Sequence, residues 1–329
     1  MERSDRAAAS HAHASPPACA VSDRRAGNLR QAVALADAID PGRTDTRLLA
    51  PRWPWRLFAP LAAPGSDHAF GAAFDASLHA PPLLAIGCGR QAALATRRLR
   101  ARGARVVQVL DPRIDPAHWD LLVVPRHDRA RGANVLTLLG SLHPVDAAWL
   151  AQAREAFAGF AALPRPRTAV LLGGSSRHVP FDRADFDLLA SQLDAALARD
   201  GGSLLLTASR RTPRELRAAL RQRYATTPGF TWLGPADGAN PYAGMLAWAD
   251  RIVCSPDSVN MISEACATDV PVHVFDPARA RSRLRVFLDD LLACGRIRAL
   301  DARLAPFDVE PLRETARIAR DVCERLDLR

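Results

Sequence analysis

Short apolar runs alternate with amphipathic segments along most of the chain. Leu29, Val33, Ala36 and Ile39 recur at intervals of three and four residues, which predicts a helix over 29–39. Apolar runs of three to five residues predict buried strands at 83–86, 106–110, 121–124, 135–139, 169–172, 204–207, 252–254 and 272–275. Further helices are predicted at 90–102, 145–160, 183–198, 213–224 and 258–267. Strands that alternate with helices form parallel sheets covered on both faces, so we expect an α/β fold.

A proline-rich segment interrupts this alternation in the middle of the chain. Residues 163–167 read Leu-Pro-Arg-Pro-Arg, and two prolines with charged neighbours are typical of an inter-domain linker. A length of 329 residues also suggests two domains. We expect a disordered leader at 1–17, Rossmann-like domains at 18–163 and 164–310, and a C-terminal helix at 311–329. Ligands bind at the carboxyl ends of parallel strands, so the cleft between the domains is the expected site.

Composition excludes several classes of protein. The chain contains no lysine, which a P-loop, a pyridoxal Schiff base and a protein kinase all require. The net charge is +9, but the arginines are spread along the chain, so we expect no nucleic-acid partner. The six cysteines form no C-x-x-C pair, so neither a metal site nor a disulfide framework is indicated, and no cofactor is expected.

The sequence gives no indication of a membrane span or of secretion. No run of about 18 apolar residues occurs, and residues 1–17 lack the continuous apolar centre of a signal peptide. We therefore expect a cytoplasmic protein. A dense run of arginines at 279–285 fits either a solvated helix face or peripheral contact with an anionic membrane surface.

The first candidate site follows the strand at 83–86. Gly87-Cys88-Gly89-Arg90-Gln91-Ala92 fits the G-x-G-x-x-A fingerprint of dinucleotide-binding domains, and Asp111 ends the next strand, where such domains hold a ribose. The same residues also fit a tight turn between a strand and a helix. This leaves an NAD-type dehydrogenase open as one interpretation.

Two turns of the second half form another candidate site. Gly173, Gly174, Ser175 and Ser176 follow a strand, where glycines let backbone N–H groups approach a phosphate, although either serine also fits a helix cap. Ser209, Arg210 and Arg211 follow the next strand, and arginine side chains suit phosphate oxygens.

The segment 255–265, SPDSVNMISEA, places polar side chains around a short helix between two buried strands. Asp257 or Ser258 is suited to cap the helix, while Met261 and Glu264 share one flank of it. A buried carboxylate is costly unless something meets it, so Glu264 is either satisfied by its own protein, solvated, or used by a ligand. In the cleft it would accept both hydroxyls of a ribose.

The motifs Ser209-Arg210-Arg211-Thr212-Pro213, Asn240-Pro241-Tyr242 and 257–265, DSVNMISEA, resemble the mitochondrial-fission Elm family of plant proteins and bacterial homologues. The resemblance extends from about Val21 to the C-terminus. That family is similar to GT-B glycosyltransferases, in which two Rossmann-like domains face each other across a cleft. The resemblance implies that Glu264 binds the ribose of a nucleotide-sugar, with 173–176 and the Ser258 region near the diphosphate.

The first turn departs from the family pattern. The family often has Asp-Gly-Arg-Pro-Gly-His-x-x-Gln, whereas this chain has Asp23-Arg24-Arg25-Ala26-Gly27-Asn28-Leu29-Arg30-Gln31. GT-B relatives often use a histidine in this turn as a base, and an amide cannot accept a proton in that way. His127 and Asp128, which look like a family stretch at a strand end, are the remaining catalytic candidates. Residues expected on the acceptor side are Asp23, Arg25, Gly27, Asn28 and Gln31.

The resemblance therefore predicts a binder of a UDP-type nucleotide-sugar and leaves open a glycosyltransferase that acts on a lipid or membrane-surface acceptor. The alternatives are a non-catalytic, membrane-associated scaffold of the same family and the NAD-type dehydrogenase.

Overall fold

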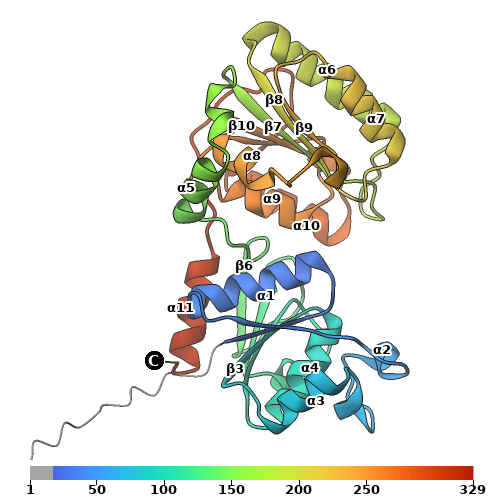
Figure 1. Cartoon of the computed structure of the whole chain (residues 1–329), viewed down its shortest axis with the longest axis vertical. Helices are drawn as coiled ribbons and strands as arrows, with labels where there is room; N and C mark the ends of the chain where they lie inside the picture. Colours follow the sequence, from blue (N-terminus) through green and yellow to red (C-terminus); the bar gives the residue numbers. More distant parts are fainter. Residues whose placement is uncertain (1–17, 329) are drawn as a thin grey trace, which may run out of the picture.

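The computed structural model describes residues 18–328, so the predicted leader at 1–17 lies outside the described residues. Two α/β domains lie one above the other, each with a six-stranded sheet (Figure 1). Every pair of neighbouring strands in both sheets is parallel, which confirms the expected fold class.

The first sheet has the order β2-β1-β3-β4-β5-β6. Its strands are β1 (Cys19–Ser22), β2 (Asp45–Leu48), β3 (Leu84–Cys88), β4 (Arg105–Val109), β5 (Leu121–Pro125) and β6 (Val135–Leu138). The helices of this half are α1 (Ala26–Ile39), α2 (Trp55–Phe58), α3 (Ala72–His79) and α4 (Arg90–Arg100). Helices α3 and α4 cover one face through a core that includes Phe74 and Leu94, and α1 covers the other through Leu35.

The second sheet has the order β12-β11-β10-β7-β8-β9. Its strands are β7 (Arg167–Leu172), β8 (Ser203–Ala208), β9 (Gly229–Trp232), β10 (Arg251–Cys254), β11 (Val272–Val274) and β12 (Ile297–Ala299). The remaining helices are α5 (Ala147–Ala156), α6 (Arg183–Asp200), α7 (Arg214–Arg223), α8 (Tyr242–Trp248), α9 (Val259–Cys266), α10 (Ser282–Ala293) and α11 (Thr315–Arg325). Helices α6 and α7 pack on one face, and α5, α8, α9 and α10 pack on the other.

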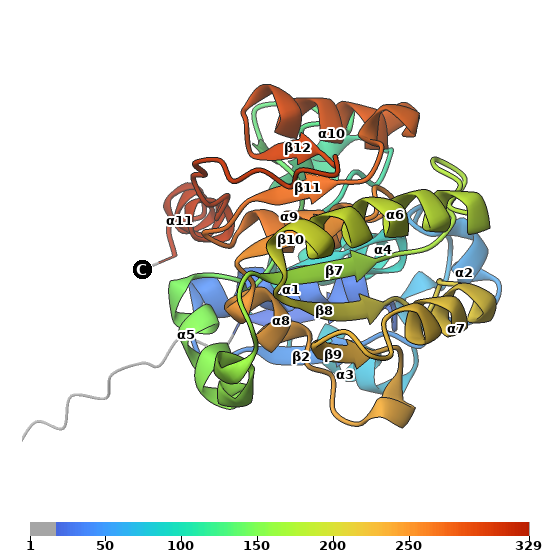
Figure 2. The same ribbon diagram turned by 90° about the horizontal axis from the view of Figure 1, so that it is seen from above.

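The chain crosses between the domains twice. Helix α5 precedes the proline-rich segment, yet Leu150 and Ala153 lie in the core of the second domain, so the first crossing falls between β6 and α5. Helix α11 returns to the first domain, where Ile318 and Val322 join the core beside α1. Helices α11 and α2 lie at opposite sides of the molecule (Figures 1 and 2). The residues that make up each domain in space are therefore not separated by a single boundary at residue 163.

His143 lies in the first crossing, and its backbone is hydrogen-bonded to Thr315, where the second crossing reaches α11. Its backbone N–H donates to Thr315 Oγ1 at 3.1 Å, and that hydroxyl donates to the His143 carbonyl at 2.8 Å. The imidazole is buried and its Nδ1 has no partner within residues 18–328. Burial is the main cause that lowers the pKa of His143 from 6.5 to about 4.

We expect the free energy of unfolding to fall as the pH drops from about 6.5 to about 4. In that window the unfolded chain binds a proton at residue 143 while the folded protein does not, which destabilises the fold by about 3 kcal/mol when complete. Urea unfolding at several pH values measures this effect. The His143→Gln variant should lose less stability between pH 7 and pH 4 than the wild type, and an equal loss would contradict the assignment.

None of the helices formed by residues 18–328 combines the length and apolar character needed to cross a membrane.

Candidate functional site

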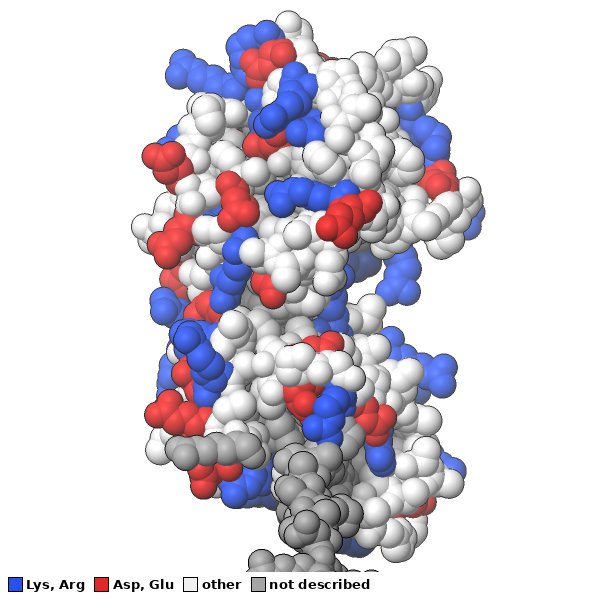
Figure 3. All heavy atoms as spheres, turned by 60° about the vertical axis from the view of Figure 1, so that its left-hand side comes forward, with Lys and Arg blue, Asp and Glu red and all other residues white. Residues whose placement is uncertain are grey.

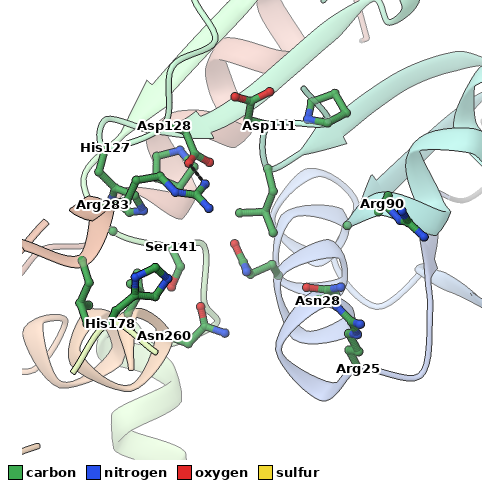
Figure 4. Close-up of a pocket in the computed structure, with 18 of the residues that line it drawn as sticks. Arg25, Asn28, Arg90, Asp111, His127, Asp128, Ser141, His178, Asn260 and Arg283 are labelled. Atoms are coloured by element: carbon green, nitrogen blue, oxygen red, sulfur yellow. Dashed lines mark hydrogen bonds and ion pairs between the residues drawn. The ribbon is translucent and has the colours of Figure 1, made fainter. Parts of the chain in front are cut away.

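A cavity of about 520 Å³ lies between the two domains, within the size range of small-molecule sites. A hollow separates the two halves of the molecule at the right of Figure 3. Acidic and basic side chains are interspersed over the face that this figure shows. The first-domain wall consists of α1 and the turns that follow β3, β4, β5 and β6. The second-domain wall includes the starts of α9 and α10. Figure 4 shows how these side chains converge.

The turn after β1 forms one side of the cavity. Three residues expected on the acceptor side line it: Arg25, Asn28 and Gln31. Asn28 donates from Nδ2 to Asp23 Oδ1 at 3.1 Å, so the amide at the family's histidine position is held by an aspartate. A Cβ on Gly27 would lie 2.6 Å from Asn260 Nδ2, so α1 approaches α9 closely here. The expected acceptor-side residues are thus brought together.

An ion pair crosses between the domains on the opposite side (Figure 4). Arg283 of α10 donates to Asp128, which is buried in the turn after β5. His127 lines the cavity beside this pair, and its Nδ1 has no partner among the described residues. Burial lowers the pKa of His127, although the charge of Asp128 opposes the shift. A neutral imidazole can accept a proton, so the structure leaves His127 chemically capable of acting as a base.

The glycine turn after β7 is occupied by the protein's own side chains. Gly173 N–H donates to Ser255 Oγ at 2.7 Å, and Gly174 N–H donates to Asp257 Oδ2 at 3.0 Å. A Cβ on Gly173 would lie 2.1 Å from the Asp257 carboxylate, so only glycine permits this approach. Arg211 completes the cluster with an ion pair to Asp257 at 2.5 Å. These two N–H groups are therefore bonded to side chains in this structure.

The neighbouring serines also make local hydrogen bonds. Ser175 Oγ donates to the Phe181 carbonyl at 2.8 Å, and Ser176 Oγ accepts from Val179 N–H at 3.2 Å. Ser209 Oγ donates to the Gly173 carbonyl at 2.8 Å and so joins the turns after β7 and β8. Arg210 is exposed at the second of these turns. Ser175, Ser176 and Ser209 thus shape the turns, while Arg210 projects from them.

Helix α9 carries Glu264, the carboxylate that the sequence predicts to need a partner. Ser258 caps the helix, with Oγ accepting from Met261 N–H at 3.4 Å. Glu264 is only 5% exposed and does not line the cavity. Its Oε1 lies 2.8 Å from Nε of Arg30, which belongs to α1 of the other domain. The carboxylate is therefore satisfied by an ion pair that joins the domains.

Tyr242 lies against the same carboxylate from the start of α8. Burial raises the pKa of Glu264, while the charge of Arg30 and the hydroxyl of Tyr242 act in the opposite direction. Burial and the neighbouring charge of Glu264 raise the pKa of Tyr242 well above 10. The Arg30 guanidinium lies 5.8 Å from the centre of the Tyr242 ring. Arg30 and Tyr242 thus form one cluster around the buried Glu264 carboxylate.

Several residues of this site have no distinct signal in the sequence. Arg30 and Arg283 belong to a chain with many arginines, so their pairing across the domains depends on the fold. Asn260 and Ser255 lie in the polar segment 255–265. The contacts of Ser255 with Gly173 and of Asn260 with Gly27 cannot be predicted from the sequence, because they depend on how the chain folds. Tyr242 was found only as part of a family motif.

The dinucleotide-like turn adopts a compact structure. Gly89 has φ +88°, and a Cβ there would lie 2.3 Å from Asn28 Nδ2, so the Asn28 side chain covers the glycine. Asp111 Oδ1 accepts from Arg113 N–H at 2.7 Å within its own turn. Both Gly89 and Asp111 line the cavity, which fits the interpretation as a structural turn and cleft wall. Residues 18–328 contain no group of three or more potential metal-binding side chains.

Comparison with solved structures shows the same overall fold. A UDP-GlcNAc 2-epimerase from Methanocaldococcus jannaschii aligns with a TM-score of 0.58 over 93% of this chain and 99% of that chain, at 13% identity. Os79 from O. sativa in complex with UDP aligns with a TM-score of 0.51 over 93% of this chain and 91% of that chain, at 12% identity. The fold is the GT-B arrangement of two Rossmann-like domains that face each other across a cleft.

Sequence comparison identifies a family. The protein is 30% identical over 282 residues to the mitochondrial fission protein ELM1 of Arabidopsis thaliana, a match that covers 75% of this chain. The match spans 65% of the length of the Arabidopsis protein. The family model described as mitochondrial fission ELM1 matches residues 26–326. The chain therefore belongs to the mitochondrial fission ELM1 family.

Proposed function

We propose that this protein binds a nucleotide-sugar in the cleft between its domains. The GT-B fold, the cavity of about 520 Å³ and the alignment with a UDP-GlcNAc 2-epimerase and with Os79 in complex with UDP support this proposal. The observation that carries it is the buried carboxylate of Glu264, which lies one helical turn beyond the cavity residue Asn260 on the same face of α9.

The ribose would take the place that Arg30 holds at Glu264. Gly27 contacts Asn260, and Arg30 contacts Glu264, so α1 covers successive turns of α9. A small separation of α1 from α9 would extend the cavity to the carboxylate. Arg30 is partly exposed and can exchange its partner for water, while Glu264 would accept the two ribose hydroxyls. Nucleotide binding and relative domain position are thus coupled in this proposal.

The diphosphate would lie at the start of α9. The first N–H groups of a helix have no partner within the helix and favour anions. Val259 and Asn260 occupy that position and line the cavity, and His178 and Arg283 line it from neighbouring segments. The glycine turn at 173–176 would support Asp257 and Ser258 from behind, with exposed Arg210 and partly buried Met261 at the margin of the nucleotide site.

Transfer of the sugar to a lipid or membrane-surface acceptor would need a base. His127 is the candidate, because it lines the cavity and its lowered pKa leaves it neutral near pH 7. Asn28 favours the second candidate function, a non-catalytic scaffold of the family, since its amide is bonded to Asp23 and cannot act as a base. Either function is compatible with a cytoplasmic protein that contacts the inner membrane peripherally.

Thermal-shift measurements with nucleotides and nucleotide-sugars test the proposal. A ligand that binds only the native state raises the melting temperature, by an amount equivalent to about 2.7 kcal/mol at 100 times its Kd. We expect a UDP-type compound to give a shift, and donor hydrolysis or transfer in the same samples would separate enzyme from scaffold. A shift with NAD(H) and none with any nucleotide-sugar would contradict the proposal and favour a dehydrogenase.

A further inference from the structure

An unusual concentration of exposed apolar side chains lies on the first domain. Within residues 18–328, ten large apolar side chains are exposed, and five of them fall between positions 48 and 61. They are Leu48, Trp53, Leu57, Phe58 and Leu61, with Trp53 at 77% exposure. We call residues 53–61, which include α2, the apolar loop. It projects at the right-hand side in both Figure 1 and Figure 2. Exposed apolar side chains gathered in one short segment are typical of an interaction site.

The apolar loop is held firmly by its backbone. Arg90 and Gln91 of α4 donate to the Arg56 carbonyl at 2.8 and 2.9 Å, and Arg97 donates to the Pro60 carbonyl at 2.6 Å. Trp55 packs against the core and donates from Nε1 to the Pro64 carbonyl at 3.0 Å. The loop therefore presents its apolar side chains on a fixed support, and their exposure does not result from a lack of anchoring.

A basic cavity of about 800 Å³ adjoins the apolar loop. Its charged lining consists of one acid, Asp23, and four arginines: Arg24, Arg25, Arg56 and Arg90. We call it the arginine pocket. It lies where the turns after β1, β2 and β3 meet, and β1 pairs with both β2 and β3, so the order of the strands reverses there. Such a reversal is the usual ligand position in an open parallel sheet.

The charges of this pocket are only partly balanced. Arg25 lies 3.6 Å from Asp23, and Arg90 donates to the Arg56 carbonyl, which carries no net charge. Four positive charges against one negative charge attract anions. Leu57 lines the pocket and is also part of the apolar loop, so charged and apolar surfaces meet at one edge.

We propose that the apolar loop and the arginine pocket bind a membrane surface that contains anionic phospholipid. The apolar side chains would enter the interfacial layer, where tryptophan is favoured, and the arginines would hold lipid phosphates. A headgroup bound there lies beside the nucleotide cleft, because Arg25 and Arg90 line both cavities. The proposal does not depend on nucleotide binding, since all of its contacts are made by the first domain.

The arginine cluster at 279–285 does not provide an equivalent surface. Arg279 is paired with Asp185, Arg283 with Asp128, and Arg285 with Asp289. Three of its four arginines thus neutralise acids of the protein.

Co-sedimentation of the full chain with vesicles tests the proposal. We expect binding to vesicles of phosphatidylcholine with phosphatidylglycerol and at least tenfold weaker binding to phosphatidylcholine alone. The variant Trp53→Ser/Leu57→Ser/Phe58→Ser and the variant Arg24→Gln/Arg56→Gln should each reduce binding at least tenfold, since the first removes the apolar side chains that enter the interface and the second removes cations that hold phosphates. The altered side chains are exposed, so melting temperatures should match the wild type.

A matched control changes Leu188→Ser and Arg281→Gln, which are exposed positions of the second domain, and should bind as the wild type does. Brominated acyl chains should quench tryptophan fluorescence in the wild type and less in Trp53→Phe, which keeps an apolar side chain. Unchanged binding of both first-domain variants would overturn the proposal. The proposal would also be overturned if the wild type did not bind vesicles but showed a thermal shift with inorganic phosphate that Arg24→Gln/Arg56→Gln lost. That result would identify a site for free phosphate.

Discussion

Glutamine in place of Glu264 is expected to weaken nucleotide binding about 5- to 150-fold, which corresponds to about 1–3 kcal/mol. The substitution keeps the shape but removes the charge that accepts two ribose hydroxyls. Hydrogen bonds to charged groups contribute about 1.5–3 kcal/mol each and neutral ones about 1. Solvent screens the half-exposed Arg30 guanidinium and so weakens the competing ion pair, and the ribose contacts are expected to dominate. Calorimetric titration of UDP, GDP and ADP measures the effect.

The partner substitution Arg30→Gln provides the matched control. It removes the competitor for Glu264 without touching the proposed ribose contacts, so affinity should stay equal or rise up to about fivefold. Equal affinities of the wild type and Glu264→Gln for whichever nucleotide binds would show that the carboxylate serves only the contact between domains.

Alanine in place of Asp257 is expected to lower the free energy of unfolding by about 2–4 kcal/mol. The carboxylate is fully buried and accepts hydrogen bonds from Gly174 N–H, Ser255 Oγ and Arg211. Its removal leaves a buried N–H without a partner, which costs about 1–3 kcal/mol, and opens a small cavity beside two glycines. Urea unfolding followed by circular dichroism measures the change.

Ser258→Ala is the comparison for this effect. It removes the neighbouring helix cap, whose bond to Met261 N–H is long at 3.4 Å, so a loss of about 0.5–1 kcal/mol is expected. If Asp257→Ala were no more destabilising than Ser258→Ala, the cluster at the glycine turn would not support the fold in the way described.

The alternation of apolar runs was sufficient to predict the repeated α/β pattern. The strand expected at 121–124 is found as Leu121–Pro125, and the helix expected at 183–198 as Arg183–Asp200. Buried strands of parallel sheets are apolar on both faces, so each can be recognised in the sequence as a continuous run of apolar residues. Strand β2 was missed because it reads Asp-Thr-Arg-Leu at the edge of its sheet, where one side has no neighbour to impose an apolar pattern.

The contacts between domains could not be predicted in the same way. Glu264 was recognised as a carboxylate that needs a partner, but spacing along the chain does not identify Arg30, which is 234 positions away, as that partner. The periodicity of α5 indicates an apolar face but not which sheet it covers, and it packs on the second domain. Such features depend on how two independently formed sheets are placed relative to each other.

A thermodynamic cycle that combines Glu264→Gln with a 2′-deoxynucleotide tests the central claim most directly. Calorimetry would measure the affinity of the wild type and of Glu264→Gln for the preferred nucleoside diphosphate and for its 2′-deoxy form. If Glu264 holds the ribose, the missing hydroxyl should weaken binding to the wild type about 5- to 10-fold but change binding to the variant much less, a coupling of about 1 kcal/mol. Absence of nucleotide binding, or the same loss in both proteins, would contradict the account.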